Sequence, residues 1–395
     1  MSDTIHPDIL HLEACNFVDK PTGGQLNFSR QLIKVLGNRL ALVGWASTSS
    51  EPIGCWFNKV IDGAVYRYFA IGMHSQVDRK PLVPSRITTW FQIRRHRHRI
   101  FSIGIKNIIV REPAILMAMK MQSGYNLCFF NPGVGSPLTV SRYAWAKYFS
   151  SIYDFLFFQS LCRKANCILA AADESAIAEL KHREGDKLQN INIISFPTRV
   201  DTDVYHPADC IAARKTLDLP VDKVVVVTTG RIHWAKGWKL LLESFKLFLD
   251  RFPDSLLIFL GDGAEREVLE KHALALGLRE NIVVAGYQSP QVIATYLQAA
   301  NLFVMGSIQE GWSTVLLEAL ACRVPIVTTR FSSADTIVQH GINGFVVDRD
   351  PLEFSNAMVA ALCLPGVALY AGSVIDRYAL DRLAHDLFRV WPLIK

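Results

Sequence analysis

Two glutamates with seven residues between them, Glu310 and Glu318, are the pair in this sequence whose spacing most strongly indicates a functional site. The apolar run at residues 301–305 before them predicts a buried strand, and residues 315–321 have helical spacing. The pair therefore flanks a strand-to-helix turn, which in an open α/β sheet lies at the ligand-binding edge. Backbone amides at a helix start favour phosphate. Two carboxylates around them can hold hydroxyl groups on either side, as a sugar nucleotide requires.

A glycine-bounded loop, Gly230 to Gly237, follows the first strand predicted for the second half of the chain. Glycine lets the backbone turn sharply there. Arg231 and Lys236 lie five positions apart in this loop, and a guanidinium with an ammonium is a good clamp for a diphosphate. Such a clamp absorbs the charge that grows on a leaving nucleoside diphosphate. The alternative is two solvated loop cations, and the nearby pair of glutamates favours the clamp.

Gly23 and Gly24 stand between the first predicted strand of the chain and a predicted helix at 25–36. A glycine pair permits a phosphate or a sugar to approach backbone N–H groups closely. Taken alone, such a pair is more often a simple turn.

Other motifs point away from metals and from common nucleotide-binding classes. Asp201-Thr202-Asp203 resembles a chelating pair, but aspartates commonly cap turns and these lie in a predicted linker. The eight cysteines include no Cys-x-x-Cys, and the histidines no His-x-x-x-His. The sequence also contains neither a Walker loop nor a Gly-x-Gly-x-x-Gly motif, which argues against a P-loop ATPase or a simple dehydrogenase. We expect no metal and no cofactor.

The elements that position these residues alternate between strands and helices. In the second half, strands are predicted at 223–229, 255–260, 281–285, 302–305, 325–328 and 344–347, with helices between them. In the first half, strands are predicted at 9–12, 40–43, 107–110, 127–130, 167–170 and 191–194. Alternation implies parallel pairing and doubly wound α/β domains. A chain of 395 residues favours two of them, residues 1–198 and 199–373, joined at the proline-flanked segment 197–207.

Positive charge is concentrated in the first half. Residues 1–200 hold 24 Lys and Arg against 14 Asp and Glu, whereas the remainder holds 18 against 22. Residues 86–111 have seven Lys and Arg, no acid and interleaved aromatics such as Trp90 and Phe91. This composition fits an anionic membrane surface or a solvated helix face, and nothing else in the sequence supports nucleic acid binding. With no spanning run or signal peptide visible, we expect a cytoplasmic protein, either free or peripheral on the inner face of the membrane.

Four motifs in register resemble the retaining glycosyltransferase family 4. They cover residues 195–360 strongly and the first half loosely, and they are Gly230-Arg231 with Lys236-Gly237, Gly261-Asp262-Gly263, Glu310 to Ala319, and Gly341 to Phe345. The resemblance implies the GT-B fold, in which two Rossmann-like domains face each other across a cleft. It also implies a last helix, about residues 374–390 within a segment 374–395, that packs back on the N-terminal domain.

The same resemblance assigns roles to the residues. Arg231 and Lys236 match positions that bind the donor diphosphate, Glu310 the glutamate that faces the donor sugar, and Glu318 the one that contacts the ribose. Further donor-binding positions are Gly230 and the turn of Gly311, Trp312, Ser313 and Thr314. Such enzymes are typically metal-independent and retain anomeric configuration, with the leaving phosphate acting as base.

One position departs from the family pattern. Many members place a histidine that faces the donor sugar after the strand equivalent to 127–130. Here the loop 131–137 contains none, and Asn131 becomes the candidate sugar contact.

The sequence therefore predicts a glycosyltransferase that moves a sugar from a nucleoside-diphosphate sugar to a glycan acceptor. A lipid-linked acceptor in bacterial surface polysaccharide or lipopolysaccharide assembly is the favoured case. Two alternatives stay open, because fold alone does not fix function. They are a sugar-nucleotide epimerase or hydrolase of the same fold, and a non-catalytic nucleotide-binding scaffold.

Overall fold

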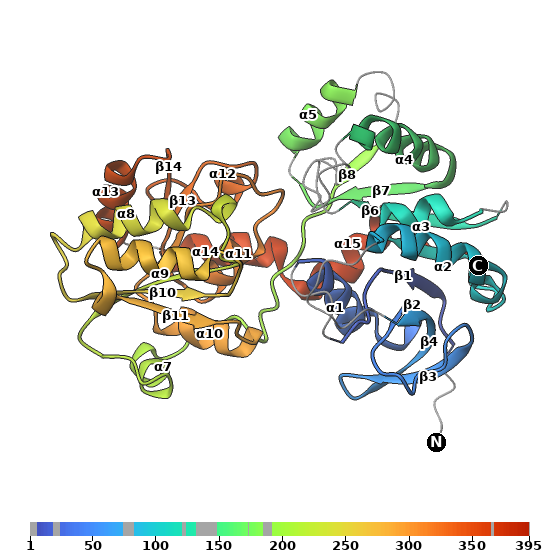
Figure 1. The fold of residues 1–395 in the computed structure, drawn as a ribbon, viewed down its shortest axis with the longest axis horizontal. Coiled ribbons are helices and arrows are strands. Elements are labelled where there is room, and N and C mark those ends of the chain that lie inside the picture. The colour runs from blue at the N-terminus through green and yellow to red at the C-terminus, as the bar shows by residue number, and fades with distance from the viewer. Residues whose placement is uncertain are drawn as a thin grey trace. The chain divides into compact units, whose positions relative to one another are not determined.

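The computed structural model describes residues 6–18, 24–73, 83–120, 124–131, 148–172, 174–184, 192–364 and 367–394. The chain divides into two compact units (Figure 1). Unit 1 comprises Met1–Pro197 with Leu383–Lys395, and unit 2 comprises Thr198–Arg382. Each unit is built on one largely or wholly parallel sheet covered by helices, which confirms the predicted doubly wound α/β class.

The sheet of unit 1 has the strand order β3-β4-β2-β1-β5-β6-β7-β8. Its strands are β1 (Ile9–Leu12), β2 (Leu40–Ala46), β3 (Trp56–Ile61), β4 (Ala64–Met73), β5 (Asn107–Val110), β6 (Asn126–Asn131), β7 (Cys167–Ala170) and β8 (Ile193–Ser195). Neighbouring strands run parallel except β3 and β4, an antiparallel hairpin that the sequence analysis missed. The central strands β1 and β5 are buried along their whole length, as expected for a parallel sheet covered on both faces.

The helices of unit 1 include two contacting groups. They are α1 (Gly24–Leu36), α2 (Ser85–Phe101), α3 (Pro113–Ala118), α4 (Ser150–Lys164), α5 (Glu174–Glu184) and α15 (Leu383–Val390), with a 3₁₀ turn η1 (Gly37–Arg39). Helix α3 contacts both α2 and α4, whereas α1 contacts α15.

Unit 2 has a six-stranded, wholly parallel sheet in the order β11-β10-β9-β12-β13-β14. The strands are β9 (Val224–Thr229), β10 (Ser255–Leu260), β11 (Ile282–Gly286), β12 (Leu302–Met305), β13 (Ile326–Thr329) and β14 (Gly344–Val347). The helices are α7 (Cys210–Thr216), α8 (Trp238–Phe248), α9 (Arg266–Ala275), α10 (Pro290–Ala299), α11 (Thr314–Ala321), α12 (Ala334–Ile337), α13 (Pro351–Ala361) and α14 (Val367–Tyr378), with 3₁₀ turns η3 (Trp234–Lys236), η4 (Arg279–Asn281) and η5 (Leu380–Arg382). Strand order reverses direction between β9 and β12, and that switch point is where ligands bind in such sheets.

The segment predicted as a linker, 197–207, is not a loose connection. Val200 pairs with Ala379 through a β-bridge, and Thr198, Val200 and Tyr205 are buried in unit 2. The turn that follows is closed by Asp201, whose side chain accepts from the N–H of Asp203 at 3.2 Å. The apolar side chains within this polar stretch explain why it packs against unit 2 instead of remaining a solvent-exposed connection.

The helix predicted for 374–390 is not continuous. Helix α14 ends at Tyr378, η5 follows, and α15 begins at Leu383, where the chain enters unit 1. Beyond α15, the buried Trp391 donates its indole N–H to Asn126 Oδ1 at 2.9 Å, and the Asn107 side chain pairs with Ile394. The returning segment is therefore held at the amino ends of β5 and β6.

Candidate active site

The loop between β9 and α8 is held by backbone contacts on both sides. The N–H of Gly230 donates to Leu260 O and that of Ile232 to Asp262 O, both at 3.0 Å, so the loop follows the end of β10. On its other side, Ile308 N–H donates to Ala235 O at 2.9 Å. The sharp turns need glycine because an added Cβ at Gly237, where φ is +72°, would lie 1.7 Å from Gly306 O. The loop is thereby fixed at the switch point.

This loop meets the loop after β12 through an ion pair. Lys236 Nζ bonds Glu310 Oε1, and Ser307 Oγ donates to the same oxygen at 2.8 Å. The structure thus brings together the predicted phosphate ligand and the predicted sugar-facing carboxylate. The Lys236 side chain is 39% exposed, so solvent screens the pair and its main effect is to orient the two groups.

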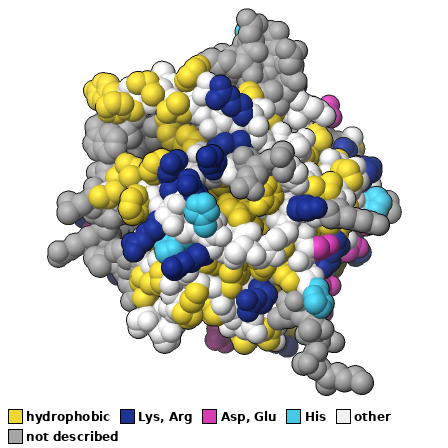
Figure 2. Space-filling model, turned by 90° about the vertical axis from the view of Figure 1, so that its right-hand side faces the viewer, with side chains coloured by type: hydrophobic (Ala, Val, Ile, Leu, Met, Phe, Trp, Pro, Cys, Tyr) yellow, Lys and Arg dark blue, Asp and Glu magenta, His cyan; other side chains and the backbone are white. Residues whose placement is uncertain are grey.

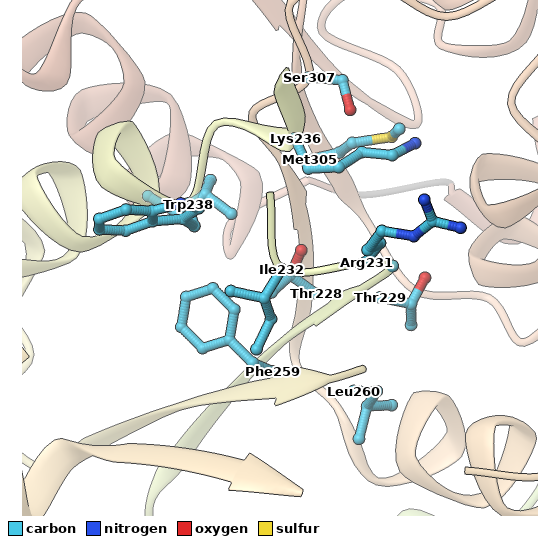
Figure 3. A pocket seen from close by; sticks show the side chains of 12 residues that line it. Thr228, Thr229, Arg231, Ile232, Lys236, Trp238, Phe259, Leu260, Met305 and Ser307 are labelled. Atoms are coloured by element: carbon cyan, nitrogen blue, oxygen red, sulfur yellow. The ribbon is translucent and has the colours of Figure 1, made fainter. Parts of the chain in front are cut away.

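A pocket of about 340 Å³, open solvent included, lies over the ends of β9, β10 and β12 (Figure 3). Its lining comprises Thr228, Thr229, Gly230, Arg231, Ile232, Lys236, Trp238, Leu241, Phe259, Leu260, Met305 and Ser307. Figure 3 shows the cationic ends of Arg231 and Lys236 extending to the same side. Two cations on a loop with close backbone approach suit an anionic ligand such as a diphosphate.

Two of the lining residues were missed by the sequence analysis. Thr229 Oγ1 is buried and has no hydrogen-bond partner among the described residues. Ser307 holds Glu310, and its own carbonyl accepts from Thr329 Oγ1 at 2.6 Å. Their only signal in the sequence is position, because both stand at or just beyond the carboxyl end of a predicted strand.

Several groups of the predicted turn before α11 already have internal partners, among them one of its amides. Ser313 N–H donates to Ser333 Oγ at 3.1 Å, and Gly311 O accepts from Ser332 Oγ at 2.8 Å. Thr314 Oγ1 lies 2.7 Å from Thr198 Oγ1. The Trp312 ring packs edge-on against Tyr378 at 4.9 Å between centroids, so this tryptophan has a packing role in unit 2.

Glu318 is buried within α11, 8% exposed. Burial raises the pKa of its carboxyl to about 7, and a hydrogen bond from the Tyr205 hydroxyl partly opposes that rise. The carboxyl therefore faces the chain segment at Tyr205, and its role as a ribose ligand stays a prediction.

The predicted site residues of unit 1 are less fully described. Gly23 lies outside the described residues, and Gly24 is the first residue of α1. Asn131 is half-buried at the end of β6, and its carbonyl accepts from Ala171 N–H at 2.9 Å. The loop 132–137 lies outside the described residues. The sugar contact predicted for Asn131 stays a prediction.

The basic segment predicted as a surface, 86–111, is only partly one. Its end is β5, a core strand, followed by the buried Arg111. Within α2, Ile93 and Ile100 are fully buried, whereas Arg94 and Arg95 are exposed. The exposed residues of this segment lie on the outward face of α2 and in the loop after it, where Lys106 is exposed.

Within the residues that the structure describes, no cluster of three or more His, Cys, Asp or Glu side chains could hold a metal ion. In the same ranges, no helix has both the length and the apolar character needed to cross a bilayer.

Comparison with known proteins bears directly on unit 2. Residues 211–363 match the model of the family described as glycosyl transferases group 1. The match lies within unit 2, and over this range the chain is similar to group 1 glycosyl transferases. The resemblance to a GT-B glycosyltransferase is thereby confirmed.

Curated relatives match part of the chain. D-inositol 3-phosphate glycosyltransferase of Acidothermus cellulolyticus is 29% identical over 244 residues, 57% of this chain and 54% of the relative. The lipopolysaccharide core biosynthesis glycosyltransferase LpsE of Rhizobium meliloti is 37% identical over 135 residues, 34% of this chain and 38% of the relative. The chain thus spans about half the length of the first relative, and less of the second.

Solved structures match over almost the whole chain. Sucrose-phosphate synthase of Thermosynechococcus elongatus has a TM-score of 0.77 at 16% identity and covers 98% of both chains. Anabaena HepE, solved in complex with UDP-glucose, has a TM-score of 0.68 at 16% identity and covers 97% of this chain and 99% of its own. At these identities the likeness establishes the fold, which is of GT-B type.

Proposed function

We propose that the protein is a glycosyltransferase that moves a sugar from a nucleoside-diphosphate sugar to a glycan acceptor. The observation that carries this proposal is the pocket at the switch point of unit 2, where Arg231 and Lys236 extend to one side and Glu310 is bonded to Lys236. The group 1 family match and the UDP-glucose complex of HepE support a nucleotide sugar as the donor.

The proposed reaction breaks the bond between the anomeric carbon and the phosphate oxygen. The electron pair stays on the diphosphate, where Arg231 and Lys236 offset the growing negative charge. Glu310 orients the donor sugar, and the diphosphate displaces it from Lys236. The acceptor hydroxyl attacks the same face of the anomeric carbon and gives its proton to the leaving phosphate, so configuration is retained. No metal or cofactor takes part in this proposal.

A lipid-linked acceptor, in surface polysaccharide or lipopolysaccharide assembly, is the favoured acceptor class. It is supported by the similarity to LpsE and by the exposed basic side chains of α2. In that case the protein would work at the cytoplasmic face of the membrane as a peripheral enzyme.

Transfer from a panel of nucleotide sugars, with and without glycan acceptors, tests the proposal. Glu310→Gln and Lys236→Ala should each lower kcat/KM about 10²-fold or more, because each removes a group at the reacting phosphate or sugar. Lys239→Ala is the matched control, since this lysine is 65% exposed on α8. Unchanged turnover in the site variants would refute their roles.

Conversion of the donor without any acceptor would instead identify an epimerase or hydrolase. Nucleotide binding without any turnover would identify a scaffold.

A further inference from the structure

Helices α2 and α4 of unit 1 share a pattern that the transfer reaction does not use. Their amino-terminal halves expose large apolar side chains that are 37–61% accessible, namely Ile87, Trp90, Phe91, Ile152, Phe155 and Leu156. Their carboxyl-terminal halves expose arginines, namely Arg94, Arg95 and Arg99 on α2 and Arg163 on α4. In both helices the exposed stripe therefore changes from apolar to cationic in the same direction.

The two helices are also aligned, because both pack on α3. At one end, Arg86 of α2 bonds Glu112 before α3 at 3.2 Å. Burial raises the pKa of Tyr153 on α4, and the nearby charge of Glu112 adds to that rise. At the other end, Lys164 of α4 donates to Leu116 O at 2.7 Å. The apolar halves thus lie at one end of the layer and the cationic halves at the other.

We infer that the exposed faces of α2 and α4 form one docking surface for an anionic lipid bilayer. Aromatic and aliphatic side chains insert at the boundary between headgroups and acyl chains, while arginines bind the headgroup phosphates. Figure 2 shows that apolar and Lys or Arg side chains adjoin on the described face in view, with acidic side chains mostly at its margins.

Charge distinguishes the bilayer from other occupants. Helix α2 contains five arginines and no Asp or Glu, so a second copy that packed on this helix through its own α2 would offer these arginines no acidic partner. A bilayer offers the complementary gradient, with an apolar interior beside an anionic surface. This surface would bring a lipid-linked acceptor close to the enzyme, and that role rests on the proposed function. Binding of the protein to the bilayer does not depend on sugar transfer.

Flotation of the full chain with vesicles tests the surface. Vesicles of phosphatidylcholine mixed with phosphatidylglycerol should bind the protein, and phosphatidylcholine alone should bind it at least tenfold more weakly. Arg94→Gln with Arg95→Gln should weaken binding to the mixed vesicles by about 25-fold, at roughly five-fold per arginine. Ile152→Ser with Phe155→Ser on α4 should weaken it by at least tenfold, because both inserted side chains are lost.

Matched controls lie on exposed positions of unit 2. Arg251→Gln with Arg279→Gln and Val268→Ser with Leu274→Ser change the same chemistry elsewhere and should leave flotation unchanged. Equal loss in the controls, or no loss in the α4 variant, would overturn the two-helix surface. The surface would also be refuted if the protein did not float with vesicles and light scattering showed a dimer that the Ile152→Ser, Phe155→Ser variant dissociates. That result would identify a second copy as the occupant. Transfer to a soluble glycan by the same variants should stay at the wild-type rate, which separates failure of the surface from failure of the proposed function.

Discussion

The two sheets end in different ways at the edge where their strands point. In unit 2, backbone segments meet closely at glycines and leave a pocket lined by Arg231 and Lys236. In unit 1, β1 and β5 are followed by the buried charges Glu13 and Arg111. The Arg111 guanidinium lies 5.3 Å from the centre of the Phe28 ring. At one edge, closely packed main chain leaves a pocket, whereas the described part of the other edge is filled by its own side chains.

This contrast teaches that composition alone does not locate a binding edge. Arg111 belongs to the most basic stretch of the sequence, yet it is buried among aromatic rings. Lys236 stands in a less basic region and lines the pocket. Glycine spacing at strand ends indicated the position of the pocket better than charge did.

The sharpest test of the main-chain edge is Gly237→Ala. The new Cβ would lie 1.7 Å from Gly306 O, so the loop must move, and we expect unit 2 to lose about 3 kcal/mol or more together with nucleotide binding. Gly341→Ala is the control, because it also has positive φ but nothing within 4 Å, and should cost about 1–2 kcal/mol. Chemical denaturation and nucleoside diphosphate titration measure both. Equal costs would contradict the close-approach argument.

Next in size is Asn126→Ala in unit 1. This side chain accepts from the Trp391 indole and donates to Pro392 O, both at 2.9 Å. Leaving those groups unpaired should cost about 2–4 kcal/mol. Hydrogen exchange should show faster opening in unit 1 and no change in unit 2. The control Asn58→Ala, on an exposed hairpin, should not change hydrogen exchange in either unit. If Asn126→Ala slowed exchange in unit 1, or destabilised both units equally, the C-terminal residues would not be what Asn126 holds.

A smaller effect is expected from pH at Glu318. Its pKa is raised from 4.5 to about 7, so between those values the folded state keeps a proton that the unfolded state has lost. Stability should therefore fall as pH rises through that window, by on the order of 1–3 kcal/mol. Glu318→Gln should flatten this part of the stability curve, measured by denaturation at several pH values. The control Glu267→Gln, at an exposed position, should keep the wild-type fall of stability with pH. If the stability of the wild-type protein did not change between pH 4.5 and 7, the proposed effect of Glu318 would be excluded.

The smallest expected change is Thr329→Val. It removes the hydrogen bond to Ser307 O with little change in volume, and should cost about 1–2 kcal/mol. Because Ser307 holds Glu310, nucleotide-sugar affinity should drop a few-fold, as calorimetry would measure. Thr295→Val on α10 serves as control. Unaltered affinity in the β13 variant would show that Glu310 keeps its place without this contact.

Much of unit 2 was predictable because its strands are short apolar runs that end in glycine or a polar loop. Strand β10 has the predicted bounds, and helix α11 begins one residue before the predicted range 315–321. The glutamate pair was also found, but spacing gave no sign that Glu318 is buried against Tyr205 while Glu310 bonds Lys236. Those partners come from other segments of the chain, and a linear pattern does not identify them.

Unit 1 was harder for physical reasons. The hairpin β3-β4 was missed because its strands, such as residues 56–61, mix polar and apolar side chains without a clean alternation. The exposed apolar face of α4 was missed as well, since Phe155 and Phe157 look alike in sequence although one is exposed and the other buried. Helical phase distinguishes them only once the packing partner is known.

The return of residues 383–394 into unit 1 sets an order for folding during synthesis. Unit 2 is encoded between the two parts of unit 1, and domains generally fold as units when their residues have emerged. Unit 2 can therefore be complete while unit 1 still lacks α15 and the indole that caps β6. On the ribosome, the later-encoded unit should be the first to become native.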